Sequence, residues 1–336
     1  MKSERSFAKT MLSAALVCAC AFGAAMPAAA QTTTQTLVIF PDQGFQPIYN
    51  LISAAKSTID MTMYELQDTT AQNLLCSAES SGVKVRVILD VNDEKSNNTT
   101  AYNQLKSCGV GVVWAYTKYE ATHEKSIVID GATANAQVAV MTANLTSRYY
   151  STTRDFAIVQ NNATDIAAIE ATFSKDYAHD SVTPTNGADL VWSPTNSQTS
   201  LLAIINNAQT SLLVENEEMS DTAIVDALED AAKAGVSVTV VMTNDDNEYK
   251  TEFNALQKDG VKISTYPDND TALYIHAKAI VADYGKSNAV AFVGSENFSS
   301  ASLTENRELG MTTTNSSILS QLESTMSSDY AGGTPW

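Results

Sequence analysis

Two short segments of this chain carry the same set of reactive side chains. Residues 123–130 and 276–283 both follow the pattern H-x-K-x4-D, with their histidines 153 residues apart. Only three histidines occur in the whole chain. An imidazole can act as a nucleophile or a proton donor near neutral pH, and a lysine adds a fixed positive charge. Two such pairs around one phosphorus atom could attack a phosphodiester, and this chemistry needs neither a metal nor a cofactor.

The duplication extends far beyond these motifs. The same offset aligns apolar, turn and polar residues along both halves of the chain. The aligned pairs include 37–41 with 190–194, Asp68 with Asp221, Gly82 with Gly235, Asn144 with Asn297, and Asp155 with Glu308. A repeat of this length exceeds the roughly 20–50 residues of a solenoid unit and matches a small domain. We therefore expect two homologous halves that face each other across a pseudo-twofold axis, so that the paired motifs converge on one site.

Each half shows the same order of predicted elements. Periodicity and capping residues predict strands and helices in alternation. The predicted strands are 37–40, 58–64, 83–90, 137–141, 211–215, 236–242 and 289–293, and the predicted helices are 48–55, 68–80, 201–208 and 221–234. This alternation predicts the α/β class, with each half an α/β sandwich in which a mixed sheet is flanked by helices.

The predicted elements bring the motif residues together. In an extended strand, residues i and i+2 point to the same side, so His123 and Lys125 should share a face, as should His276 and Lys278. A further predicted strand follows each motif and ends just before an asparagine, Asn144 or Asn297. Adjacent strands could place these amides beside the His/Lys face.

At this level of detail the chain resembles the phospholipase D superfamily. The second copy matches closely, with His276, Lys278, Asp283, then Gly-Ser-Glu-Asn over 294–297, and then Glu308. The first copy departs from the pattern, because Met-Thr-Ala-Asn stands at 141–144 and Asp155 replaces the commoner glutamate. The hydroxyl and the carboxylate are nevertheless kept. The resemblance spans nearly all of the chain from residue 37 onward.

The resemblance implies a phosphohistidine mechanism without a metal. In this interpretation His123 is the nucleophile and His276 is the general acid and base. Lys125, Lys278, Asn144 and Asn297 would hold the phosphoryl oxygens. Asp155 and Glu308 each lie 32 residues after the histidine of their own copy and would accept an imidazole N–H. Asp130 and Asp283 are interpreted as structural anchors of the turn after each motif.

The N-terminus and the charge suggest the setting. Basic residues, an apolar run and a small-residue site before residue 31 predict a secretory signal peptide over 1–30. The first half would then cover 31–180, a linker with the start of the second repeat 181–200, and the second half 201–336. The net charge of −18 favours solubility and argues against a broad nucleic-acid surface. Cys76 and Cys108 remain after cleavage, and the sequence leaves open whether they pair or stay as buried thiols.

Three functions remain open on the sequence. The first is a secreted phospholipase D that acts on a phospholipid, with water or an alcohol as acceptor and transient contact with the membrane surface. The second is a metal-independent nuclease of the same superfamily, and the third is a non-catalytic binding module. Two complete motif sets disfavour the third, and the scarcity of Lys/Arg clusters disfavours the second. We expect a monomer without an obligate nucleic-acid partner.

Two further features of the sequence bear on this choice. Asn144 and Asn297 both lie in glycosylation sequons, and a glycan there would block the site, so we predict a bacterial protein exported to the periplasm or the medium. Glu215, Glu217 and Glu218 form an acidic cluster. A solvated loop is the favoured interpretation of this cluster, and contact with a cationic headgroup is the alternative.

Overall fold

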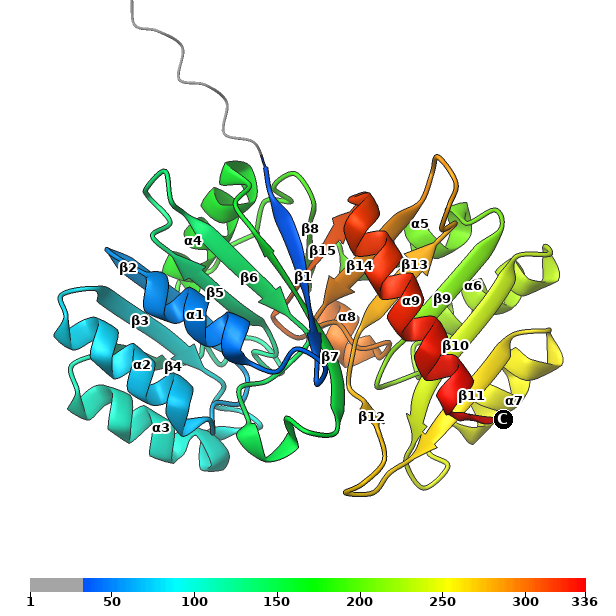
Figure 1. Ribbon diagram of the computed structural model, residues 1–336, viewed down its shortest axis with the longest axis horizontal. Coiled ribbons are helices and arrows are strands. Elements are labelled where there is room, and N and C mark those ends of the chain that lie inside the picture. The colour runs from blue at the N-terminus through cyan, green and yellow to red at the C-terminus, as the bar shows by residue number, and fades with distance from the viewer. Residues whose placement is uncertain (1–32) are drawn as a thin grey trace, which may run out of the picture. The chain divides into compact units, whose positions relative to one another are not determined.

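The computed structural model describes residues 33–336, and the predicted signal peptide lies outside the described residues. The first half builds one sheet with its helices (Figure 1). Its strands are β1 (Gln35–Phe40), β2 (Thr58–Met63), β3 (Lys84–Leu89), β4 (Gly111–Trp114), β5 (Lys125–Ile129), β6 (Gln137–Met141) and β7 (Thr153–Gln160). Its helices are α1 (Gln46–Ala54), α2 (Thr69–Ser80), α3 (Lys95–Ser107), the 3₁₀ turn η1 (Ser147–Tyr149) and α4 (Ala163–Tyr177).

The second half repeats this order. Its strands are β8 (Leu190–Ser193), β9 (Ser211–Glu215), β10 (Ser237–Asn244), β11 (Lys262–Pro267), β12 (Tyr274–Ile275), β13 (Ala279–Ala282), β14 (Val290–Gly294), β15 (Glu308–Thr313) and β16 (Thr334–Pro335). Its helices are α5 (Ser197–Asn207), α6 (Thr222–Lys233), α7 (Lys250–Lys258), α8 (Ser300–Thr304) and α9 (Ser316–Gly332). Residues 178–189, which form neither helix nor strand, connect α4 to β8.

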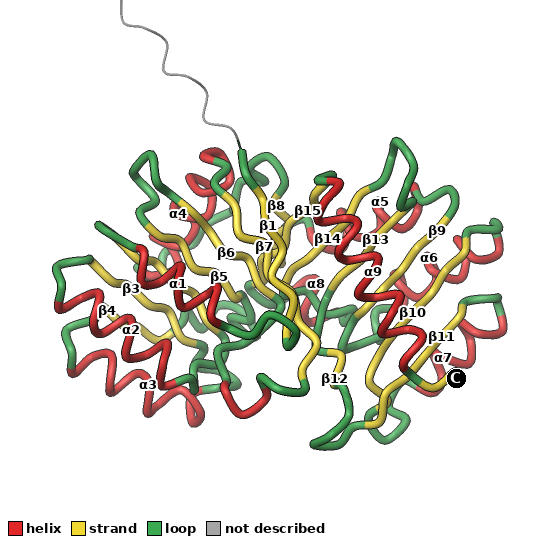
Figure 2. Tube along the Cα trace, in the orientation of Figure 1, coloured by secondary structure: helices red, strands yellow, loops and turns green. Residues whose placement is uncertain are grey.

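The two sheets have equivalent topologies. The first runs β1-β7-β6-β5-β2-β3-β4, with β12 paired to β7, and the second runs β16-β11-β10-β9-β13-β14-β15-β8. In each sheet the first βαβ segments give parallel pairs, such as β2 with β3 and β9 with β10, and the remaining pairs are mainly antiparallel. The predicted fold class is therefore confirmed, with two mixed-sheet α/β halves flanked by helices (Figure 2).

Alternation along the strands divides the core into layers. In β3, Val87 and Leu89 face the helices α1 to α3, whereas Ile88 faces α4 on the opposite side of the sheet. A separate core layer joins the two halves, where residues such as Phe156 and Trp192 pack in one cluster. The contact between the two sheets is thus an apolar core, and it fixes where the motif residues of each half lie.

The predicted helix start at Asp68 is confirmed. Its carboxylate accepts hydrogen bonds from the backbone N–H groups of Thr70 and Ala71 at the beginning of α2. Cys76 in α2 and Cys108 after α3 form a disulfide, which answers the question that the sequence left open. No helix among residues 33–336 has the length and apolar character needed to cross a bilayer.

Candidate active site at the junction of the two halves

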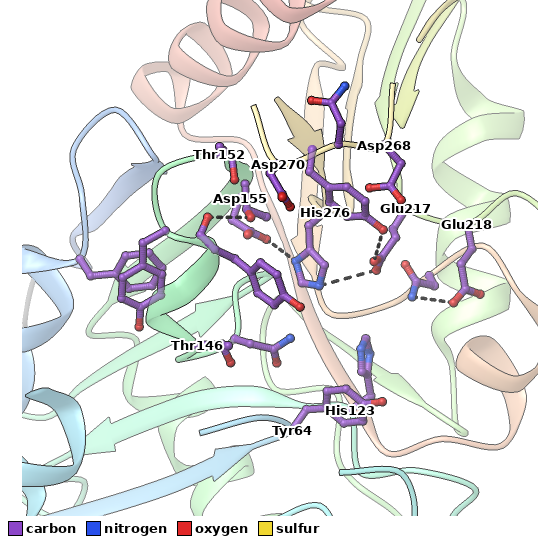
Figure 3. A pocket seen from close by; sticks show the side chains of 18 residues that line it. Tyr64, His123, Thr146, Thr152, Asp155, Glu217, Glu218, Asp268, Asp270 and His276 are labelled. Carbon is purple, nitrogen blue, oxygen red and sulfur yellow. Dashed lines mark hydrogen bonds and ion pairs between the residues drawn. The ribbon is translucent and has the colours of Figure 1, made fainter. Parts of the chain in front are cut away.

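The two motif histidines line the same cavity. This cavity of about 490 Å³ lies between the halves and is also lined by Asn144, Asn297 and Asp155. Figure 3 shows His276 between Asp155 and Glu217, with His123 beside Tyr64. The sequence prediction that both copies converge on one site agrees with this arrangement. Lys125, Lys278 and Glu308 are fully buried behind the lining.

His123 is held by the second half of the chain. It lies just before β5, and its backbone N–H donates to Arg307 O over 2.9 Å. Its ring Nδ1 lies 2.8 Å from Glu308 Oε2 and 3.1 Å from Ser295 O. Both of these atoms accept hydrogen bonds, so Nδ1 carries the proton and Nε2 keeps its lone pair. Burial lowers the pKa of His123, although Glu308 opposes the shift, so the ring is neutral at neutral pH.

His276 is held in the same way by the first half. Its backbone N–H donates to Arg154 O over 3.2 Å, and its Nδ1 lies 2.7 Å from Asp155 Oδ1. Thr142 Oγ1 also donates to Asp155 Oδ1, over 2.5 Å. The unusual Thr142 and Asp155 of the first copy therefore act together, and the hydroxyl fixes the carboxylate that orients the ring.

Each of the two carboxylates therefore contacts the histidine of the opposite half. The spacing of 32 residues suggested that each would serve the histidine of its own copy, but Glu308 binds His123 and Asp155 binds His276. The reason is that β7 and β15 lie near the junction of the two halves, where each strand reaches the loop before the opposite motif. Such reciprocal contacts are what a twofold relation between the halves produces.

A second pair of crossed contacts supports the first. Arg154 Nε lies 2.6 Å from Asp329 Oδ2, and Arg307 Nε lies 2.8 Å from Asp176 Oδ2. All four side chains are buried. Sequence reasoning missed them, although each arginine and each aspartate stands at the same offset of 153 residues. Each arginine directly precedes a carboxylate that contacts a histidine, so these ion pairs fix the position of that carboxylate.

The two lysines occupy different electrostatic environments. Lys125 Nζ donates to His123 O over 2.5 Å and lies 4.9 Å from the centre of the Tyr64 ring. Burial lowers the pKa of Lys125 to about 7. Lys278 Nζ makes the equivalent bond to His276 O over 2.5 Å, but it also donates to Glu217 Oε2 over 2.8 Å. The two lysines thus differ in one neighbour, because Glu217 contacts Lys278 whereas its equivalent Tyr64 contacts Lys125.

The two asparagines both reach the cavity. Within the described part of the chain, Asn144 Oδ1 and Asn297 Oδ1 are buried without a hydrogen-bond partner. Asn297 Nδ2 donates to Glu218 Oε1 over 3.0 Å. An amide oxygen accepts hydrogen bonds, so these two unpartnered atoms suit a bound water or ligand that carries an O–H or N–H donor.

The acidic cluster is not a solvated loop, and this interpretation was wrong. Glu217 and Glu218 line the cavity, and Glu215 is completely buried in β9. Burial raises the pKa of Glu217, but Lys278 and His276 lower it more strongly, so this carboxyl stays ionised. Asp268 and Asp270, which the sequence did not single out, also line the cavity. The entrance is therefore acidic.

The last residue of each motif anchors a turn. Asp130 Oδ1 accepts hydrogen bonds from Ser57 N, Ser57 Oγ and Thr58 N, at 2.6 to 3.1 Å. Asp283 Oδ1 makes the equivalent set with Thr210 and Ser211. Both aspartates have a positive φ, of 53° and 52°, a conformation that aspartate tolerates better than most residues. Neither lines the cavity.

Comparison with known proteins agrees with this architecture. The family model described as "Cardiolipin synthase, PLD-like domain" matches twice, at residues 48–177 and 201–330. No curated protein sequence matches the chain significantly.

Two solved structures share the fold. The phosphatidylserine synthase of Haemophilus influenzae aligns with a TM-score of 0.69 and 12% identity, over 90% of this chain and 87% of that one. The polyphosphate kinase of Porphyromonas gingivalis aligns with a TM-score of 0.69 and 14% identity, over 88% of this chain. The chain spans only 50% of the kinase. At these identities the likeness concerns the fold.

Proposed function

The chain belongs to the phospholipase D superfamily, and we propose that it is a phosphodiesterase of phospholipase D type that removes phospholipid headgroups through a phosphohistidine intermediate. Water is the proposed acceptor, and transfer to another alcohol is the alternative outcome of the second step. The observation that carries the proposal is the pair of imidazoles from different halves in one cavity, each bonded at Nδ1 to a carboxylate of the opposite half.

The proposed first step uses both histidines. His123 Nε2 attacks the phosphorus, and the bond from phosphorus to the leaving oxygen breaks with its electron pair moving to that oxygen. The oxygen takes a proton from His276 Nε2 and departs as an alcohol. Lys125, Asn144 and Asn297 offset the negative charge that builds up on the phosphoryl oxygens.

The proposed second step reverses these roles. Water attacks the phosphorus and gives a proton to His276, while the bond from phosphorus to His123 Nε2 breaks and restores the free imidazole. An alcohol in place of water gives transphosphatidylation. Both steps balance without a redox partner, and Glu308 and Asp155 keep the rings in the required tautomers.

The charge around the cavity supports a small headgroup rather than a polymer. The lining includes Glu217, Glu218, Asp268 and Asp270, which would repel a nucleic-acid strand. Arg154 is buried in its ion pair with Asp329, so its charge does not face a ligand. The description of the matching family model also favours a phospholipid.

We further propose that the protein acts outside the cytoplasm as a monomer and touches lipid only transiently. The Cys76–Cys108 disulfide supports an oxidising compartment. Among the described residues, the exposed large hydrophobic side chains are Tyr149 and Tyr284, and Tyr149 also lines the cavity. One exposed ring at the entrance suits brief contact with a lipid surface.

The test compares phosphatidylcholine vesicles, phosphatidylethanolamine vesicles and single-stranded DNA as substrates, with EDTA present. We expect lipid turnover in the wild type and its loss in His123→Ala and in His276→Ala. Cleavage of DNA alone, abolished by both substitutions, would instead identify a nuclease. Lipid turnover that EDTA stops would contradict the metal-free mechanism, and turnover of no substrate would favour a binding module.

A further inference from the structure

The two halves differ in charge at one pair of equivalent positions in the site. Glu217 follows β9, and its equivalent Tyr64 follows β2, 153 residues earlier. Tyr64 packs edge-on against His123 with 4.5 Å between the ring centres. Glu217 Oε2 lies 3.6 Å from His276 Nε2 and 2.8 Å from Lys278 Nζ. An aromatic ring thus contacts one motif, whereas a carboxylate contacts the other.

This difference changes the charge around each histidine. His123 is contacted by a single carboxylate, that of Glu308, and its other close neighbours are the Tyr64 ring and Lys125, whose pKa is lowered to about 7. His276 is contacted by two carboxylates, Asp155 and Glu217, and Lys278 is the neighbouring ammonium. A second carboxylate therefore lies within ion-pair distance of His276 Nε2, whereas His123 has only one carboxylate in contact with it.

Glu217 is itself held in place. Tyr274 donates its hydroxyl to Glu217 Oε1 over 3.0 Å, while Lys278 binds the other oxygen. A carboxylate fixed at both oxygens cannot turn away from the imidazole without losing one of these bonds. Figure 3 shows the carboxylate of Glu217 on the opposite side of His276 from Asp155.

We propose that Glu217 assigns different roles to the two histidines, because its carboxylate holds a proton on His276 Nε2 for the leaving alcohol while Tyr64 leaves His123 free to attack. This inference rests on the proposed function. Glu217 is a positioning residue in this scheme, since it acts through His276 and takes no part in the net proton balance. The proton that leaves with the alcohol comes from His276 and is replaced by a proton from water in the second step.

The test uses two lipids that differ only in the leaving alcohol, phosphatidylethanol and phosphatidyl-p-nitrophenol. Ethoxide needs a proton to depart, whereas p-nitrophenolate leaves without one. In single-turnover measurements, Glu217→Gln should slow cleavage of phosphatidylethanol by about 10-fold or more, through the rate constant rather than KM. The release of p-nitrophenolate should stay within about twofold of the wild-type rate, and this second rate also reports that the variant is folded.

Control variants distinguish a failure of the role of Glu217 from a failure of the proposed phosphodiesterase activity. His123→Ala should lose cleavage of both lipids, and His276→Ala should lose mainly the cleavage of phosphatidylethanol. Asp226→Asn, which removes an exposed carboxylate from α6, should change neither rate. If the histidine variants behave this way but Glu217→Gln slows both lipids equally, slows neither, or raises only KM, the role of Glu217 is refuted. If the histidine variants match the wild type, the proposed function itself is refuted.

Discussion

His123 Nδ1 lies 2.8 Å from Glu308 Oε2, although the two residues belong to different copies of the internal repeat. The mirror contact between His276 and Asp155 is 2.7 Å long. Neither half therefore contains both members of a histidine–carboxylate pair, and each pair forms only at the junction between the halves.

Neutralising Glu308 should impair the proposed nucleophile His123, whereas neutralising Asp155 should impair the proposed acid His276. Glu308→Gln removes the negative charge beside His123 Nδ1 and should lower kcat by about 10²- to 10⁴-fold, whatever the leaving group. Asp155→Asn affects His276 and should slow alkyl esters much more than p-nitrophenyl esters. Single-turnover rates with both ester types measure this. Equal losses in both variants on both esters would contradict the assignment of nucleophile and acid.

The crossed ion pairs should matter for stability as well as for activity. Arg307→Leu leaves Asp176 buried without its cation and should lower the free energy of unfolding by about 3–5 kcal/mol. Replacing Asp176 by leucine as well should recover part of this loss, because no unpaired buried charge remains. Urea unfolding of the two variants checks the prediction. A double variant less stable than the single one would argue that the pair itself is a net source of stability.

The disulfide should stabilise the first half. Cys76 and Cys108 close a loop with a sequence separation of 32 residues, so Cys76→Ser with Cys108→Ser should cost about 3–4 kcal/mol on the chain-entropy model. Reduction of the wild type with dithiothreitol should lower the midpoint of thermal unfolding in the same direction. The double serine variant serves as the control, because dithiothreitol should leave its midpoint unchanged.

The buried Glu296 should make the fold less stable as pH rises. Both of its carboxylate oxygens lack a partner among the described residues, and burial raises its pKa well above the ordinary value. The folded state then keeps a proton that the unfolded state releases, so stability falls as pH rises above the unfolded pKa of about 4.3. Glu296→Gln should flatten this dependence. Unfolding midpoints at several pH values would show parallel curves for both proteins if the prediction is wrong.

The motif aspartates should affect folding more than catalysis. Asp130→Asn replaces a carboxylate that accepts hydrogen bonds from Lys56, Ser57 and Thr58. The loss should lower the free energy of unfolding by about 1–3 kcal/mol. Those backbone N–H groups hold the pKa of Asp130 below its usual value although burial alone would raise it, so its contribution is present above about pH 4 and is lost on acidification. At a temperature well below its unfolding midpoint, the Asp130→Asn variant should keep a kcat within a few-fold of the wild-type value. A loss comparable with that of His123→Ala would assign Asp130 to the site.

The sequence was sufficient for the fold class and for most of the site, because duplication marks equivalent residues without any alignment of relatives. Predicted elements agree with β9 over Ser211–Glu215 and with α2 to within a residue of each end. The strand predicted to carry each histidine begins after it, at Lys125 or Ala279. In both copies the loop before the strand bonds to the opposite half instead.

Other parts of the site depend on tertiary contacts that spacing does not encode. An offset of 153 residues shows that Asp155 and Glu308 are equivalent, but not which histidine each one meets. The sequence indicated Glu217 only as part of an acidic cluster and not as a neighbour of His276, because the equivalent residue Tyr64 is not a carboxylate. The disulfide could not be assigned for a similar reason, since only the packing of α2 against α3 brings the two sulfur atoms together.

The covalent connection through residues 178–189 has a consequence for how such a site can evolve. In a dimer of identical subunits, one gene specifies both sides, so a glutamate introduced beside one histidine would also appear beside the other. A single polypeptide removes that restriction. Because both repeats lie in one chain, each can acquire its own substitutions. Glu217, which lies next to only one of the two histidines, is a difference that a symmetric homodimer could not encode.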